Sequence, residues 1–265
     1  VRQVSVHELQ LDWPDVKLPP LNVEVSLAEG HALHSAYVET VDGDLNVNVT
    51  PEDKGHLIML KAKKWQLPLA MPVLVDNADV EMHLNGSRLD VPKLTVGLYG
   101  GEVGGNLVLS WAKHWQLNGK LKVANVSVKE PSSLVSKTVY LSGNLSGDAG
   151  FSAQAKEAGS LMDHLQANFK FNVNNGVLHG LDLVKVASLL INQGEKGGET
   201  RFVEFAGLVN VSGSQYHLKD IKISSGLLAA SGQVKVKANK ELDGLVEVEL
   251  KRSVSLVAIP LDVSG

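Results

Sequence analysis

Apolar and polar residues alternate with a period of two along most of this chain. Val80, Met82 and Leu84 are separated by Glu81 and His83, and similar short runs are LNVEVSL, DLNVNVT, LVNVS, IKIS and LVEVEL. Successive side chains of a strand point to opposite faces of a sheet, so each run predicts a strand with one apolar face. Gly, Asn, Asp and Pro between the runs predict turns. We therefore expect about twelve or more strands, mostly antiparallel and joined by hairpins.

Helical patterns are few. The segment SLMDHL opens with Ser160 and has Asp163 three residues later, which is the spacing of a capping box. A second candidate runs from Asp182 to Asn192, with apolar residues at helical spacing and Gly194 as a stop signal. Both segments are expected to form short helices that lie on a sheet.

An internal repeat with an offset of 127 residues pairs Gly86 with Gly213. The same offset keeps further apolar residues and glycines in register: Met82 with Val209, Leu84 with Val211, Leu94 with Ile221, Val96 with Ile223, Gly105 with Gly232, Leu107 with Val234, and Leu109 with Val236. Two copies of one multi-strand unit explain this pattern, and we expect them to superpose as strand meanders with matching faces.

Composition excludes several classes of function. The 265 residues include 44% hydrophobic but only 5% aromatic residues, so the apolar surface should be mainly aliphatic, with few platforms for stacking on bases. A net charge of −4 provides no positive field for phosphate backbones, and we expect no nucleic-acid partner. The absence of Cys excludes disulfides and thiolate chemistry and is compatible with an oxidising compartment.

No segment has the pattern of a catalytic, cofactor or metal site. GLYGGEVGG at residues 97–105 is followed by no helical pattern, so turns and bulges explain its glycines better than a phosphate-binding loop. GEKGGET at residues 194–200 lacks the Gly-Lys-Ser/Thr ending of a nucleotide-binding loop. His31 and His34 form a close pair without identifiable further ligands. We expect no enzyme activity, no cofactor and no metal.

The C-terminal half carries a set of motifs with a specific order and spacing. GLDL at residues 180–183 precedes the second helical segment, and GGETRFVEF at residues 197–205 follows it. The later positions are Gly207, Gly213, Asp220, Gly232, Leu242 and Asp243. These motifs resemble the C-terminal region of the AsmA-like family, and the resemblance covers roughly residues 75–265, whereas the N-terminal part fits only generically.

The resemblance implies an envelope protein of Gram-negative bacteria. Relatives of this kind are similar to bridge-like lipid transfer proteins, in which a long curled sheet forms a groove for phospholipid acyl chains. It further implies a periplasmic location and attachment to the inner membrane through an N-terminal segment that would precede Val1. The expected ligand is therefore phospholipid or another acyl-chain lipid.

Two folds can cover the apolar faces of so many strands. An extended antiparallel sheet can curl around an apolar groove that a ligand fills, or a second sheet can pack on the first as a β-sandwich. The residues alone favour the sandwich, and the family resemblance favours the groove with a few short helices. We expect a strand-rich segment at residues 1–75 and an AsmA-like domain at residues 76–265, joined in one continuous sheet.

The candidate lipid-binding residues lie in the two repeat copies. They are Met82, Leu84, Leu94, Val96, Leu107, Leu109, Val209, Val211, Ile221, Ile223, Val234 and Val236. The expected function is non-enzymatic binding or transport of phospholipid between membranes, which would serve outer-membrane biogenesis. The alternative is a structural scaffold or adhesin-like β-sandwich in the envelope.

Overall fold

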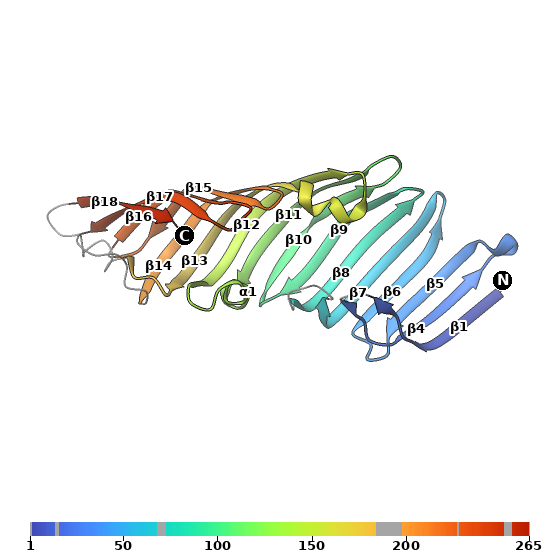
Figure 1. Cartoon of the computed structure of the whole chain (residues 1–265). Helices are drawn as coiled ribbons and strands as arrows, with labels where there is room; N and C mark the ends of the chain where they lie inside the picture. Colours follow the sequence, from blue (N-terminus) through green and yellow to red (C-terminus); the bar gives the residue numbers. More distant parts are fainter. Residues whose placement is uncertain are drawn as a thin grey trace. The chain divides into compact units, whose positions relative to one another are not determined.

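The computed structural model describes residues 2–13, 16–67, 73–183, 198–226, 228–251 and 256–264. Sixteen strands form one antiparallel sheet in which neighbours follow the order of the chain, apart from β2 and β3, which pair separately. Figure 1 shows this succession as a continuous change of colour from strand to strand. The prediction of a mainly-β, antiparallel fold built from hairpins is confirmed.

The chain divides into two compact units, Val1–Leu121 and Lys122–Gly265. The sequence-based division at residues 75 and 76 falls inside β8. The strands of the first unit are β1 (Arg2–Leu9), β2 (Asp12–Trp13), β3 (Val16–Lys17), β4 (Leu21–Leu27), β5 (Leu33–Thr40), β6 (Leu45–Glu52), β7 (Gly55–Leu67), β8 (Val73–Asn85), β9 (Arg88–Leu98) and β10 (Gly101–Ser110). A short 3₁₀ turn, η1 (Glu29–His31), lies between β4 and β5.

The second unit has the same hairpin connectivity, with helical segments in the connections on either side of β12. Strand β11 (Trp115–Ser127) begins in the first unit and ends in the second. The remaining strands are β12 (Tyr140–Ala155), β13 (Gln166–His179), β14 (Glu199–Ser212), β15 (Gln215–Ser224), β16 (Leu228–Val236), β17 (Leu242–Lys251) and β18 (Leu256–Ser264). Helix α1 (Lys129–Val135) connects β11 to β12, and the 3₁₀ turns η2 (Ala158–Ser160) and η3 (Met162–His164) connect β12 to β13.

The register of the first unit separates apolar from polar residues across seven strands. Directly paired residues of an antiparallel sheet lie on the same face. One row of successive partners consists of Val6, Val23, Val38, Val47, Leu60, Val80 and Leu94. The adjacent row on the opposite face consists of Ser5, Glu24, Tyr37, Asn48, Met59, Glu81 and Lys93. The first unit therefore has one aliphatic face and one mainly polar face.

The second unit is divided in the same way. Its apolar row consists of Leu145, Val173, Phe205, Ile223, Ala230 and Val248. The adjacent row on the opposite face consists of Ser146, Asn172, Ala206, Lys222, Ser231 and Glu247. The alternation in the sequence thus determines both faces of both units.

The predicted repeat is confirmed in the strand pairing. Each copy is a three-strand meander, β8–β10 and β14–β16. Both first turns have a glycine with positive φ, 56° at Gly86 and 55° at Gly213. The register shift between β9 and β10 separates the pairs Val91–Leu107 and Leu94–Gly105, and the shift between β15 and β16 separates Leu218–Val234 and Ile221–Gly232. An offset of 127 residues converts the first set of pairs into the second.

The helical predictions are only partly matched. Residues around Ser160 form two 3₁₀ turns instead of one α-helix, and neither turn has a side-chain cap. Ser160 caps neither turn and β13 already begins at Gln166, so the capping-box spacing was a misleading signal. The second predicted helix lies almost wholly outside the described residues. Helix α1 was not predicted, although Pro131 in its first turn is a recognisable start signal.

Candidate functional site

The predicted lipid-binding residues fall on the apolar face of their own unit. In the first unit, Met82 opposes Ile58, Leu84 and Leu109 both oppose Leu89, Leu94 opposes Val80, Val96 opposes Val103, and Leu107 opposes Val91. In the second unit, Val209 and Val234 both oppose Leu218, Val211 and Val236 both oppose Tyr216, Ile221 opposes Gly232, and Ile223 opposes Phe205. Only Ile221 is buried, and the other eleven are half-buried.

The described residues leave the apolar face of the first unit partly exposed, although Leu21, Ala62 and Val91 on this face are buried. Val4 and Val6 at its edge strand are 50% and 39% exposed, and the interior valines of its central row are only half-buried. Within the described residues of this unit, the β2–β3 pair is the only strand pairing outside the large sheet. Exposed apolar surface costs roughly 25 cal/mol per Å² relative to burial. The face is therefore suited to an apolar ligand or partner.

The apolar face of the second unit is partly filled by its own side chains. Phe171, Val173 and Phe202 are buried in one cluster, and the ring of Phe205 contacts those of Phe171 and Phe202 edge-on, at centroid distances of 5.2 and 5.9 Å. A second cluster buries Leu183, Leu228, Ala230 and Val248. Ile223 packs against both clusters. This unit is thus closer to an ordinary hydrophobic core than the first.

The sequence reasoning did not identify the phenylalanine cluster. Four of the five Phe residues of the chain belong to this cluster. The low aromatic content had instead predicted a mainly aliphatic apolar surface. The alternation of Phe169 and Phe171 with Lys170 was the available signal. It places both rings on the apolar face, because Lys170 must then lie on the other.

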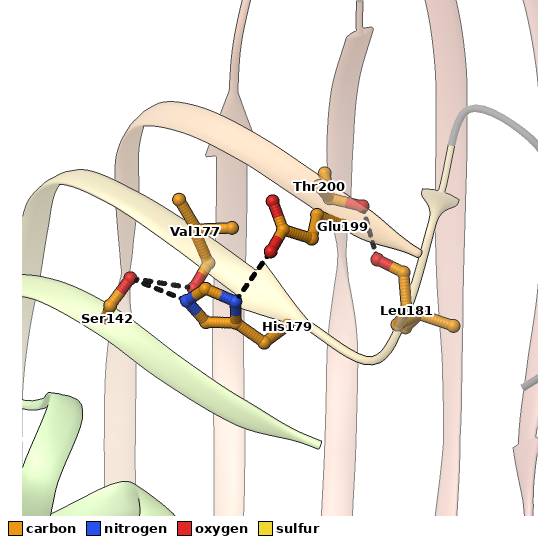
Figure 2. A network of polar contacts seen from close by, with 6 residues as sticks. All are labelled: Ser142, Val177, His179, Leu181, Glu199 and Thr200. Carbon is orange, nitrogen blue, oxygen red and sulfur yellow. Dashed lines mark hydrogen bonds and ion pairs between the residues drawn. The ribbon is translucent and has the colours of Figure 1, made fainter. Parts of the chain in front are cut away.

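A polar network links three strands of the second unit (Figure 2). Nε2 of His179 lies 3.0 Å from Oγ of Ser142, and Nδ1 lies 3.0 Å from Oε1 of Glu199. The His179 ring also stacks on Tyr140, with the centroids 4.4 Å apart. Hydroxyl, imidazole and carboxylate occur in this order in serine hydrolases.

The setting of this network favours a structural role. The hydroxyl of Ser142 also lies within 3.4 Å of the carbonyl oxygen of Val177, which it can donate to instead of the imidazole. His179 is the direct cross-strand partner of Tyr140 on β12 and of Glu199 on β14, and Ser142 is the direct partner of Val177. We interpret the network as a polar ladder that fixes the register of these strands.

Thr200 closes the loop between β13 and β14. Its hydroxyl donates to the carbonyl oxygen of Leu181 and accepts from the backbone N–H of Leu183, both at 2.8 Å (Figure 2 shows the first bond). The side chain is almost completely buried. The Thr of the predicted GGETRFVEF motif thus holds the GLDL motif against the sheet.

The polar faces contain few perturbed ionisable groups. His83 lies between two carboxylates, with Nδ1 2.9 Å from Glu52 and Nε2 3.1 Å from Glu81, and these hydrogen bonds raise the pKa of His83. Over the part of the chain that the structure describes, no group of three or more His, Asp or Glu side chains could hold a metal ion.

Two hollows open on the polar face of the second unit. One, of about 390 Å³, is lined by residues that include Lys219, Gln233 and Glu247. The other, of about 440 Å³, lies at one end of β13–β16 and is named the polar hollow here. The ladder of Ser142, His179 and Glu199 lines neither.

Comparison with models of protein families identifies the family to which the chain belongs. The family model described as the AsmA family matches residues 39–220. The chain belongs to the AsmA family. Members of the AsmA family are associated with the cell envelope, and the match spans the whole of β6–β14, which includes the apolar face of β6–β10 and the phenylalanine cluster. The suspected family resemblance is confirmed.

Other comparisons add no relative. Neither the curated proteins nor the solved structures gave a significant match to this AsmA-family chain. A search of the described residues for a helix with the length and apolarity to cross a membrane found none.

Proposed function

We propose that the chain binds phospholipid through the apolar faces of its sheet and moves it between the membranes of the envelope, without catalysis. The observation that carries the proposal is the aliphatic row of the first unit, in which seven paired positions on seven strands are Val or Leu. Membership of the AsmA family supports the envelope setting. A periplasmic location and an inner-membrane anchor upstream of residue 1 belong to the same proposal.

The row supports transport as well as binding. Neighbouring strands lie about 4.8 Å apart, so each aliphatic side chain is in contact distance of the next along the row. A charged residue within the row would impose a desolvation barrier on an acyl chain that moves across the strands. Because the row contains none, an acyl chain can pass from strand to strand while the polar head group stays in water.

The scaffold alternative receives no comparable support. A β-sandwich needs a second layer over the apolar face, and the described residues of the first unit provide only the two-stranded β2–β3 pair outside the main sheet. No observation supports an enzyme either, since strand pairing explains the set of Ser142, His179 and Glu199. We therefore retain lipid binding as the function.

The test compares one carboxylate on either face of the same strand. Val47 is half-buried on the apolar face of β6, and its neighbour Asn48 is exposed on the polar face. Val47→Asp should reduce the phospholipid recovered by organic extraction of the purified protein several-fold, because the carboxylate would lie among acyl chains. Asn48→Asp adds the same charge in water and should leave the yield unchanged.

Circular dichroism and thermal midpoints establish that both variants are folded. Quantitative mass spectrometry of the extracts then gives the lipid-to-protein ratio. Equal lipid in the two folded variants would disprove the assignment of this face, and a parent protein that yields no lipid after gentle purification would disprove lipid binding itself.

A further inference from the structure

We propose that the polar hollow of the second unit is a binding site for a phosphate-bearing ligand, on the face opposite the one assigned to acyl chains. The hollow lies where β13 and β15 begin and β14 and β16 end. Its volume of about 440 Å³ accommodates a small polar molecule. This inference does not depend on lipid binding by the apolar face.

The strand register places the polar side chains that line the hollow on one face. Its inner row consists of the successive cross-strand partners Asn168, Asn210, His217 and Lys235. Its outer row consists of Gln166, Ser212 and Gln215. The lining also includes Ala167, Val211, Tyr216 and Val236 at the intervening positions, so polar groups from four strands alternate with apolar residues around the hollow.

The chemistry of this lining is rich in hydrogen-bond donors. Four amide side chains, an imidazole, two hydroxyl-bearing residues, Lys235 and Lys237 contribute, and no Asp or Glu belongs to the lining. Phosphate oxygens accept several hydrogen bonds and are favoured by ammonium groups. A hollow with two lysines and no carboxylate is therefore matched to an anion of this kind.

The donors are only loosely engaged by the protein. Gln166 donates to Ser212 at 3.0 Å, and Nε2 of His217 lies 3.3 Å from Oε1 of Gln233. Lys237 pairs with Glu241 at 3.1 Å, but both side chains are more than half exposed, so the pair is easily exchanged. Lys235 is exposed, and its cross-strand neighbour on β17 is Asp243. A ligand can therefore recruit both ammonium groups.

The internal repeat shows that the fold does not require these donors. At the 127-residue offset, His217 corresponds to Asp90 and Lys235 to Val108. In the first unit the Asp90 carboxylate is held by Arg88, with Nε of Arg88 2.8 Å from Oδ2, which lowers the pKa of Asp90. The same meander thus folds with an acidic and an apolar residue at these two positions. The cationic set of the second unit is specific to that copy.

This correspondence supplies the test variant. His217→Asp combined with Lys235→Val places the residues of the first meander into the second, where the pairing is the same. Isothermal titration calorimetry at low ionic strength should show saturable binding of glycerol phosphate to the parent, little binding of uncharged glycerol, and at least ten-fold weaker binding of glycerol phosphate to the double variant. Lys222→Val removes one charge from the same face outside the hollow, and should bind like the parent.

Vesicles distinguish a lipid head group from a soluble phosphate. Sedimentation with phosphatidylglycerol vesicles that glycerol phosphate competes away would assign the site to head groups, and binding of glycerol phosphate without vesicle binding would assign it to a free ligand. The inference is overturned if the parent binds glycerol phosphate no better than glycerol, or if the double variant binds as well as the parent. Should the double variant unfold, the exposed single change Lys235→Val decides the same question.

The two proposals fail separately. Phospholipid extracted from the double variant should match the parent, because the hollow and the apolar face lie on opposite sides of the sheet. Loss of extracted lipid in that variant would show that the two faces are not independent.

Discussion

At the scale of single residues, Thr200 shows how one buried hydroxyl organises a loop. It satisfies the N–H of Leu183 and the carbonyl of Leu181 while its own strand pairs with β13. Leu183 is one of the buried members of a hydrophobic cluster on β16 and β17. The two hydrogen bonds therefore determine where a loop residue enters the core.

Replacing Thr200 by Val should destabilise the protein by about 2–4 kcal/mol, because two buried backbone groups would lose their partner. Thr200→Ser keeps the hydroxyl and should cost about 1 kcal/mol for the lost methyl group. Chemical denaturation followed by circular dichroism measures both values. A Val variant as stable as the Ser variant would mean that the hydroxyl is not needed to hold the loop.

At the scale of elements, the building unit is the three-strand meander with the register shift that both copies share. The glycine beside the shift permits close approach of the next strand: a Cβ at Gly105 would overlap the carbonyl oxygen of Lys120, and one at Gly232 would overlap that of Leu245. The same feature thus recurs in both copies. Strand glycines mark such positions because no other residue leaves the space empty.

Gly232→Ala should therefore lower the free energy of unfolding by about 1–3 kcal/mol through displacement of β17. Gly150 on β12 is the matched control, since a Cβ there meets no atom within 4 Å. Gly150→Ala should change stability by less than about 1 kcal/mol. The comparison is made by urea denaturation, and equal effects of the two substitutions would contradict the steric explanation.

The strands and the repeat were predictable because a period of two and spaced glycines leave a direct mark on the sequence. The pairing of Met82 and Leu94 with apolar partners followed from that pattern. The ladder of Ser142, His179 and Glu199 was not predictable, because it depends on the register of three strands rather than on any local motif. The α-helix predicted near Ser160 was wrong, because the capping-box spacing is a local signal and neither 3₁₀ turn has a side-chain cap hydrogen bond.

At the scale of the whole molecule, one-sided apolarity is the dominant property. Both units have an apolar and a polar face, but the second packs phenylalanine rings into part of its apolar face, whereas the central apolar row of the first is only half-buried. The first unit should accordingly depend more on an external apolar partner. This difference is visible only from burial, because both units have the same alternation in sequence.

Delipidated, folded protein should therefore bind an environment-sensitive dye such as anilinonaphthalene sulfonate, and phospholipid should displace it. Val47→Asp should reduce the dye fluorescence more than Asn48→Asp, since only Val47 belongs to the aliphatic row. The measurement is made well below the thermal midpoint so that unfolded chains do not contribute. A folded, lipid-free protein without dye binding would show that the face is covered.

The order of the strands in the sheet has a consequence for how such proteins can change in length. The start of one meander, β8, and the start of its repeat, β14, are six strands apart in the chain, which is an even number. Duplication or deletion of a whole hairpin adds or removes two strands and so preserves this parity. Each added strand keeps its own alternation of apolar and polar residues. The number of strands can then change during evolution without any change in the design of the individual strand.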